Sequence, residues 1–226
     1  MGRVPTSRDP RRRVSRCVLA ALASGAVLLL PACSGGSSTD GPPVPAFPAA
    51  GAGPASNAGP PSRNTLLPTD CNQVISKDDL PNLLGLPLGT TGVTALRDVP
   101  APSVGRLERV TCNYTSAGGP GAPANGTLVL KVLSNGYTTP AAAQAQAEVN
   151  AQVEQSSGVA GVPTQIGAAQ ATYYDDPDGP LLVVVYGRIS TSLTLGSSPV
   201  GRGQARSVLV DLAQRVLPVL VPAGGP

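Results

Sequence analysis

An uncharged apolar run of 13 residues, 18–30, follows a cluster of arginines near the start of the chain and ends just before a cysteine. A transmembrane helix needs about 20 apolar residues, so this run is too short to span a bilayer comfortably. It has the length of the hydrophobic region of a secretory signal peptide, and the arginines within 11–16 match the positive region that precedes one. The pattern predicts an exported chain whose first part is removed.

The sequence Leu30-Pro31-Ala32-Cys33 closes this run. It resembles the lipobox of bacterial lipoproteins, although Pro31 replaces the small residue that is commoner there. The resemblance implies that residues 1–32 are a signal peptide, cleaved between Ala32 and Cys33, and that the Cys33 thiol carries acyl chains. Two or three chains would anchor the protein durably, because each buried methylene contributes about 0.8 kcal/mol. The alternative for Cys33 is an ordinary thiol or disulfide cysteine, and the arginine run leaves a twin-arginine export route open.

Residues 33–68 hold eight prolines and only two charged side chains. Proline lacks a backbone donor and glycine loses the most entropy on ordering, so we predict a disordered tether here, rich in Pro, Gly, Ser and Ala. A single globular domain is expected at 69–222, which is long enough for a hydrophobic core. A disordered tail is expected at 223–226.

The clearest structural signal in 69–222 is a helix at 205–217, where Ala, Val and Leu recur at helical spacing and Pro218 is expected to end the helix. Thr139 and Pro140 predict the start of another helix that runs to about 155. The remaining expected elements are a short helix at 76–84, strands at 107–114, 128–133, 181–186 and 189–195, and a short strand within 162–174. Ser76 would cap the short helix through the N–H of Asp79 and Gly85 would stop it, while the late position of Pro81 leaves open a start at Lys77 or later.

Strands that follow one another with short connections favour antiparallel pairing. The expected fold class is therefore α+β, an antiparallel sheet packed with helices (an α/β sandwich) and closed by one disulfide. Four cysteines are present, of which Cys17 lies in the signal peptide and Cys33 is the acylated one. Cys71 and Cys112 remain, and in an oxidising compartment they are predicted to form a disulfide. A redox-active pair is the alternative, but it usually needs closer spacing.

The chain contains no histidine. This excludes Ser-His-Asp and Cys-His catalysis on this chain alone, as well as any histidine-ligated metal site. Two cysteines without a further ligand make a poor zinc site, so no metal or cofactor is expected. Residues 1–33 carry six arginines against one aspartate, whereas the remaining residues carry ten basic and twelve acidic side chains. Because nucleic-acid binding needs clustered Lys and Arg, no nucleic-acid partner is expected.

Three aspartates cluster at 175–179, in the sequence DDPDG. A calcium loop needs further oxygen ligands and a glutamate at fixed spacing, so Pro177 and Gly179 favour a hairpin turn instead. Gly201-Arg202-Gly203 could receive an anion at a helix N-terminus, but we interpret it as a flexible lead-in to the last helix. We interpret four of the five tyrosines of the domain as core or sheet-face residues: Tyr114, Tyr173, Tyr174 and Tyr186.

Several short motifs resemble those of exported lipoproteins of actinobacteria, the mycobacterial type in particular. They are Cys71-Asn72-Gln73-Val74, Leu83-Leu84-Gly85, Val110-Thr111-Cys112-Asn113-Tyr114 and the terminal helix. The chain is similar over 69–220 to a two-cysteine lipoprotein domain of unknown function. The resemblance implies a sandwich like that of the PsbP and Mog1 proteins, and it supplies no catalytic residues.

These observations predict a lipoprotein anchored by Cys33 at the extracytoplasmic face of the cell membrane. Its partners would be the lipid bilayer and an envelope protein or component, which a non-catalytic binding, accessory or sensor domain would recognise. The alternative is a carrier of an apolar ligand such as a lipid, favoured by the aliphatic composition; a cavity lined by Leu and Val would support it. An enzyme that uses only Asp, Glu, Lys, Ser or Tyr would need convergent polar groups in one cleft.

Overall fold

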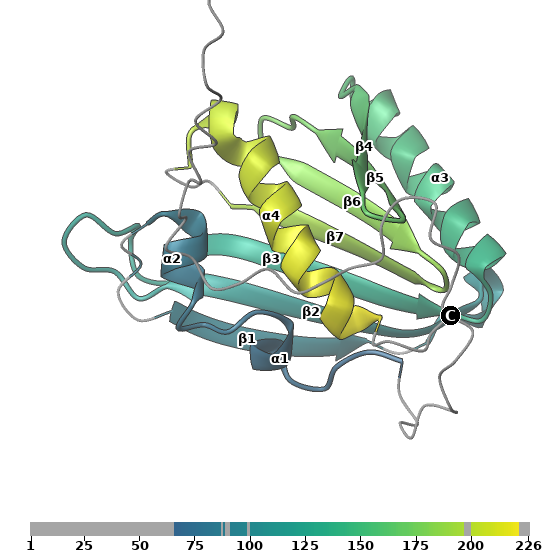
Figure 1. Ribbon diagram of the computed structural model, residues 1–226, viewed down its shortest axis with the longest axis horizontal. Coiled ribbons are helices and arrows are strands. Elements are labelled where there is room, and N and C mark those ends of the chain that lie inside the picture. Colours follow the sequence, from purple (N-terminus) through teal and green to yellow (C-terminus); the bar gives the residue numbers. More distant parts are fainter. Residues whose placement is uncertain (1–65, 87, 89–90, 99, 197–199, 222–226) are drawn as a thin grey trace, which may run out of the picture. The chain divides into compact units, whose positions relative to one another are not determined.

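The computed structural model describes residues 66–86, 88, 91–98, 100–196 and 200–221 (Figure 1). All of them belong to one compact unit, Asp40–Pro226, and the other unit, Met1–Thr39, lies outside the described residues. The described strands are β1 (Thr91–Asp98), β2 (Arg106–Ser116), β3 (Leu128–Tyr137), β4 (Gly161–Ile166), β5 (Ala169–Tyr174), β6 (Leu181–Tyr186) and β7 (Ile189–Leu195). The described helices are α1 (Cys71–Val74), α2 (Leu80–Leu84), α3 (Pro140–Ser156) and α4 (Arg202–Leu220), with a 3-10 turn, η1, at Pro102–Val104.

The seven described strands form one antiparallel sheet in the spatial order β1-β2-β3-β7-β6-β5-β4. Two meanders produce this order. β1, β2 and β3 pair in sequence, α3 crosses one face, and β4 to β7 run back until β7 pairs with β3. An antiparallel sheet packed with helices is therefore the observed architecture, as predicted.

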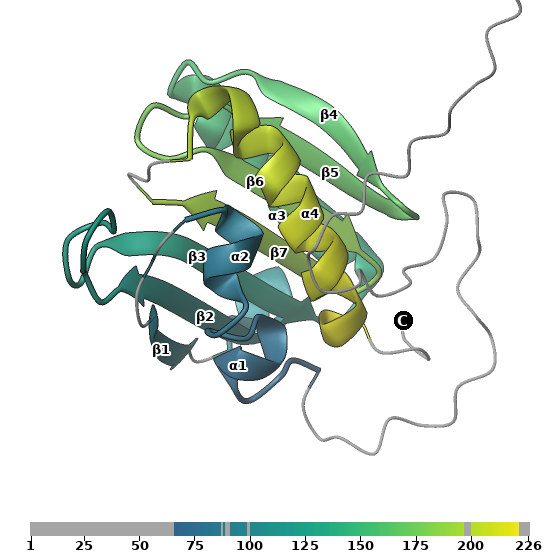
Figure 2. The same ribbon diagram turned by 60° about the vertical axis from the view of Figure 1, so that its left-hand side comes forward.

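The front face of the sheet packs against α1 and α4, while α2 packs against α4 (Figures 1 and 2). Cys112 marks this face because its sulfur is bonded to α1. Residues that lie opposite one another in adjacent strands share a face, so the same row continues through Val132, Leu193 and Leu182, all of them buried. The predicted stripe of α4 covers this row. Its member Val208 is half-buried, and Leu220, beyond the predicted end, is buried as well; the buried members of the predicted stripe are Ala205, Leu209, Leu212, Ala213, Val216 and Leu217. Each fully buried Leu or Val contributes about 1.5–3 kcal/mol, so this layer dominates the core.

The back face of the sheet carries α3, which Figure 2 draws behind the strands. The helix starts as predicted, because the Thr139 hydroxyl accepts a hydrogen bond from the Ala142 amide at 3.1 Å and Pro140 occupies the first turn. Ala143 is fully buried against the sheet, and Ala147 and Ala151 are half-buried on the same side. These small side chains let the helix lie close to the strands.

The helix predicted at 76–84 is shorter than expected, because α2 begins only at Leu80. A separate short helix, α1, precedes it, and Ser76 lies between the two. Its hydroxyl accepts from the Asp78 amide at 3.2 Å rather than from that of Asp79. Pro81 explains the late start of α2, since proline fits only the first turn of a helix. Gly85 ends α2 as predicted, with a φ of 63°.

Three other features differ from the sequence prediction. β1 was not predicted at all, and 162–174 contains two strands, β4 and β5, joined by a turn in which Gly167 has a φ of 55°. Pro218 does not end α4, which continues to Leu220. Leu220 is only 2% exposed, so burial of this residue in the core outweighs the cost of a proline near the helix end.

Residues 66–68, which the sequence assigned to the tether, pack against the described domain. The Glu108 carboxylate accepts hydrogen bonds from the amides of Leu66 and Leu67, the second at 2.8 Å, and it also pairs with Arg97 at 3.5 Å. Leu67 is 2% exposed. The folded part therefore includes these three residues. The Glu108 side chain of β2 holds the start of this folded part against the sheet.

Gly196 follows β7 at a position without room for a side chain. A Cβ placed there would lie 1.8 Å from the backbone oxygen of Leu128, which is held in the sheet. We expect Gly196→Ala to lower the free energy of unfolding by about 3 kcal/mol, because backbone atoms must move to relieve the overlap. Chemical denaturation measures this change. Gly203→Ala is the control, since a Cβ at Gly203 meets nothing within 4 Å; equal stability of the two variants would contradict the prediction.

Candidate functional site

The predicted cleavage and lipidation residues, Ala32 and Cys33, lie outside the described residues. Within the described part of the chain, no helix is both long enough and apolar enough to cross a membrane. The structure therefore bears on the domain, and the anchor remains a prediction.

The disulfide between Cys71 and Cys112 is confirmed. The two Cα atoms are 5.6 Å apart, 41 residues separate the cysteines in the sequence, and both side chains are buried at 0% and 1% exposure. The bond joins the first helix to the centre of β2. Its burial within the core identifies it as a structural cross-link rather than a site for exchange with other thiols.

Tyr114 reinforces the same junction. Its hydroxyl donates to the backbone oxygens of Cys71 at 2.8 Å and Ile75 at 3.2 Å, and the side chain is fully buried. Burial raises the pKa of this hydroxyl well above its usual range, so it remains a hydrogen-bond donor at any physiological pH. Tyr114, Tyr173 and Tyr174 are buried, and Tyr186 is a half-buried residue of β6, so all four are core or sheet-face residues as predicted.

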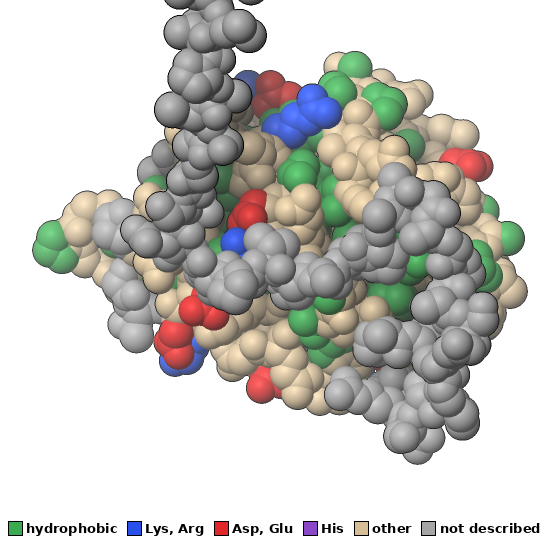
Figure 3. All heavy atoms as spheres, in the orientation of Figure 1, with side chains coloured by type: hydrophobic (Ala, Val, Ile, Leu, Met, Phe, Trp, Pro, Cys, Tyr) green, Lys and Arg blue, Asp and Glu red, His purple; other side chains and the backbone are tan. Residues whose placement is uncertain are grey.

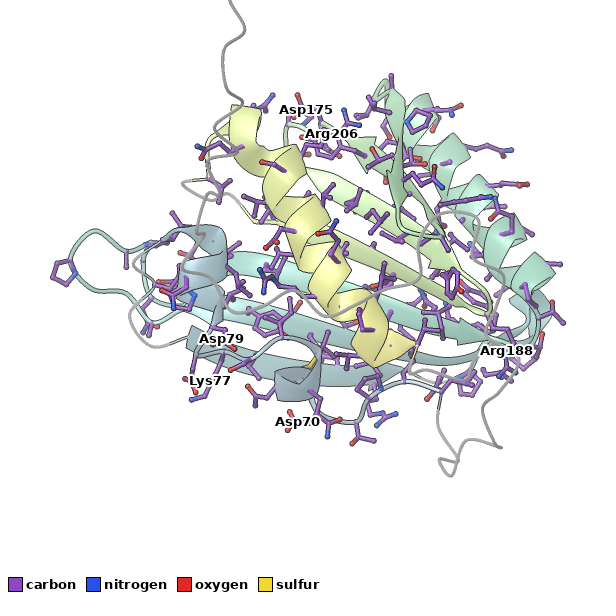
Figure 4. All side chains as sticks on the ribbon, viewed as in Figure 1. Asp70, Lys77, Asp79, Asp175, Arg188 and Arg206 are labelled. Carbon is purple, nitrogen blue, oxygen red and sulfur yellow. A yellow bond between two sulfur atoms is a disulfide. The ribbon has the colours of Figure 1, made fainter. Side chains whose placement is uncertain are left out.

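The acidic segment 175–179 forms a turn, as predicted. The Asp176 carboxylate accepts from the Asp178 amide at 2.8 Å, which is the local bond that aspartate makes in turns. Asp175 accepts a hydrogen bond from the Tyr173 hydroxyl at 3.3 Å, and Arg206, near the start of α4, lies over the ring of the same tyrosine (Figure 4). Burial first, and then the charge of Asp175, raise the pKa of Tyr173. Among the described residues, no group of three or more Asp, Glu or Cys side chains is arranged to hold a metal ion.

Arg206 occupies the end of the front face next to the edge strand β4. Its guanidinium lies 6.0 Å from the centre of the Tyr173 ring and donates to the Thr164 hydroxyl at 2.9 Å. These contacts tie α4 to β4 and β5. Figure 3, which looks onto this face, shows charged side chains of both signs scattered over it rather than gathered in one patch.

The back face differs because α3 covers only part of it. α3 packs mainly against β3, β4, β6 and β7. The back-face row that passes through Thr111 also contains Leu96 on β1 and Leu133 on β3. Leu96 is 51% exposed and Leu133 is half-buried. The exposed and half-buried back-face side chains of β1, β2 and β3 are called the open half below, and the following described residues define it: Thr94, Leu96, Arg109, Asn113, Thr115, Lys131 and Leu133.

The open half combines apolar and basic groups. Arg109 donates to the Asn135 side chain at 3.0 Å and makes a further interaction. No described acidic side chain lies within ion-pair distance of Lys131, whereas Lys77 and Arg215 each pair with an aspartate. The sequence analysis missed this surface for two reasons. It did not predict β1, and it did not predict the order in which the strands pair. The arrangement suits contact with a surface that carries apolar and acidic side chains.

No protein-family model matches this chain, and no curated protein matches it significantly in sequence. The candidate surface therefore follows from the chain's own residues.

Proposed function

We propose that the protein is a lipoprotein, anchored through acylated Cys33 at the outer face of the cell membrane, whose domain is a non-catalytic binding module for an envelope protein. The order of arginines, apolar run and lipobox-like sequence at 11–33 supports the anchor. A buried disulfide supports an oxidising location, because structural disulfides are rare in reducing compartments.

The open half is the single observation that carries the binding role. An exposed apolar patch rimmed by polar side chains marks a contact surface, and we take Leu96 and Leu133, with the polar side chains around them, as such a patch. The absence of histidine from the chain and the use of the 175–179 carboxylates within a turn favour binding over catalysis. The partner we propose presents a carboxylate to Lys131 and apolar side chains to Leu96 and Leu133.

Site-specific photo-crosslinking in the native envelope tests this role. A photoreactive amino acid in place of Leu96 is expected to form a discrete adduct, because 51% of that side chain is exposed on the open half. Val162 is the matched control, since it is 43% exposed on the opposite edge strand, β4. We expect the adduct at Leu96 and little at Val162.

The identity of the adduct separates the alternatives. A protein adduct at Leu96 that Lys131→Glu abolishes supports the binding module. A lipid adduct would favour the carrier of an apolar ligand instead. Equal labelling at both positions, or no labelling at either, would contradict a binding role for the open half.

A further inference from the structure

β1 lies at one edge of the sheet and pairs with β2 alone (Figure 1). An edge strand presents a row of backbone N–H and C=O groups that no neighbouring strand uses, and proteins usually protect such a row with a proline, with charges or by keeping the strand short. β1 is eight residues long and contains no proline. Its charged residues, Arg97 and Asp98, come only at its end, and Arg97 pairs with Glu108 on β2. Most of this edge therefore lacks the usual protection.

The hydrogen bonds of β2 indicate which backbone groups of β1 point outward. The Ser116 amide donates to the Thr127 oxygen at 2.9 Å and the Ser116 oxygen accepts from the Gly126 amide at 2.8 Å, so the backbone of Ser116 faces β3. Backbone groups alternate in direction along an antiparallel strand, so Thr115 faces β1, where Gly92 lies opposite. No described residue pairs with the outer side of β1. The same alternation along β1 leaves three residues whose backbone groups point away from β2: Val93, Ala95 and Arg97.

The other edge strand, β4, is protected at the same kind of position. Pro163 lies in the middle of its six residues, and a proline in a sheet occupies an edge position whose nitrogen faces solvent. The alternation then places the backbone groups of Gly161 and Gln165 on the same outer side. A strand that approached β4 would find no central donor and would meet the proline ring. Of the two edges, β1 is the one that can receive a further strand.

We infer that the envelope protein binds by adding an extended segment to β1 as a further strand of the sheet. The outward groups of β1 recur at every second residue, about 6.8 Å apart, and an extended polypeptide repeats its own donors and acceptors at the same spacing. An acyl chain or another apolar ligand has no such groups. This inference rests on the proposed function, since it takes the envelope protein as the partner and states how it binds.

The open half determines the side chains that this segment should carry. Leu96 lies on the back face of β1 in one row with Thr111 and Leu133, and it is 51% exposed. Side chains directly opposite one another on adjacent strands contact each other, so the residue opposite Leu96 would extend this row. An apolar side chain at that position would cover the exposed leucine. The partner segment is therefore an extended strand with an apolar residue opposite Leu96 and without a proline opposite Ala95.

Ala95→Pro tests this inference, because it removes the central outward donor of β1 without removing a bond to β2. The variant is made in the full-length protein that carries the photoreactive amino acid at Leu96, and cross-linking is performed in the native envelope. We expect the yield of the protein adduct to fall about tenfold or more, the effect of losing one or two backbone hydrogen bonds. Gln165→Pro, which makes the same change on the outer side of β4, and Ala95→Val, which keeps the N–H of β1, are matched controls and should retain the adduct.

Hydrogen exchange measured residue by residue is a second test, which does not require Ala95→Pro to fold. The outward amides of Val93, Ala95 and Arg97 should exchange rapidly in the purified full-length protein. They should exchange about tenfold or more slowly when the protein is labelled in the native envelope, because a bound strand must leave before they open. The outward amides of Gly161 and Gln165 on β4 should exchange at the same rate in both samples.

The outcomes separate strand addition from the binding role itself, and circular dichroism checks that the variants are folded. A Leu96 adduct that a folded Ala95→Pro protein still forms would overturn strand addition and leave the binding role of the open half standing. Outward amides of β1 that exchange equally fast in both samples would do the same. An adduct with the mass of two copies of this chain, or a cross-link within one chain, would overturn the envelope protein as the partner. No protein adduct at Leu96 without any further substitution would remove both proposals.

Discussion

Cys33→Ala is expected to release the protein from the membrane fraction entirely. Lipidation at Cys33 depends on its thiol in the lipobox-like sequence, so the variant would carry no acyl chain. Each chain contributes about 0.8 kcal/mol per buried methylene, and two or more are needed for durable attachment. Fractionation of cells together with the intact mass of the purified protein measures the result. The wild-type mass should correspond to a chain that begins at Cys33 and carries added acyl groups.

Cys17→Ala is the matched control for this prediction. Cys17 lies only 16 residues earlier in the same segment, but it would be removed with the signal peptide. Its replacement should therefore leave attachment and mass unchanged. A Cys33→Ala protein that remains with the membranes would show that another feature, such as the apolar run 18–30, holds it there.

The parts of the fold that were predictable from the sequence are those with a strong local signal. The α4 stripe was predicted because apolar residues at helical spacing must share one face, and its members are buried in the core. The disulfide was predicted by counting cysteines after two had been assigned to the N-terminal segment. The start of α3 was predicted because threonine and proline favour the cap and first position of a helix.

β1 could not be predicted because its sequence lacks the alternation that marks a half-buried strand. Its side chains are exposed on both faces, from Thr94 to Arg97, and Gly92 weakens the strand signal further. This strand forms because it pairs with β2 over eight residues, and not because its own sequence favours a strand. The end of α4 was missed for a related reason, since tertiary packing of Leu220 overrides the local effect of Pro218.

The candidate surface depends on topology, which no local pattern contains. The open half exists because α3 leaves β3 and crosses toward β4, at the far edge of the sheet, so that it covers β7 and β6 but not β1 and β2. A chain with the same elements and another strand order would bury Leu96 and Leu133 beneath the helix. The residues of the surface could therefore be found only after the strand order was known.

The double variant Cys71→Ala/Cys112→Ala is expected to lower the free energy of unfolding by about 4 kcal/mol, the loop-closure entropy of a cross-link of this span. The bond joins α1 to β2, and its two cysteines lie 41 positions apart in the sequence. Domains of this size are stable by only about 5–15 kcal/mol, so the variant would lie close to the limit of folding. Urea unfolding measures the change, and the slope of the transition should rise because the unfolded chain becomes more expanded.

The wild-type protein unfolded and refolded in a strong reductant is the control for this variant. It loses the same cross-link but keeps both sulfur atoms, so it separates the entropic effect from the loss of packing at Cys71 and Cys112, which are 0% and 1% exposed. We expect the reduced protein to lose most of the same stability. In the reduced protein Tyr114 still donates hydrogen bonds to the backbone at α1, so α1 should stay attached until the sheet unfolds. When Tyr114→Phe is added, α1 should detach before the sheet unfolds. Unchanged stability in both the variant and the reduced protein would contradict a structural role for the disulfide.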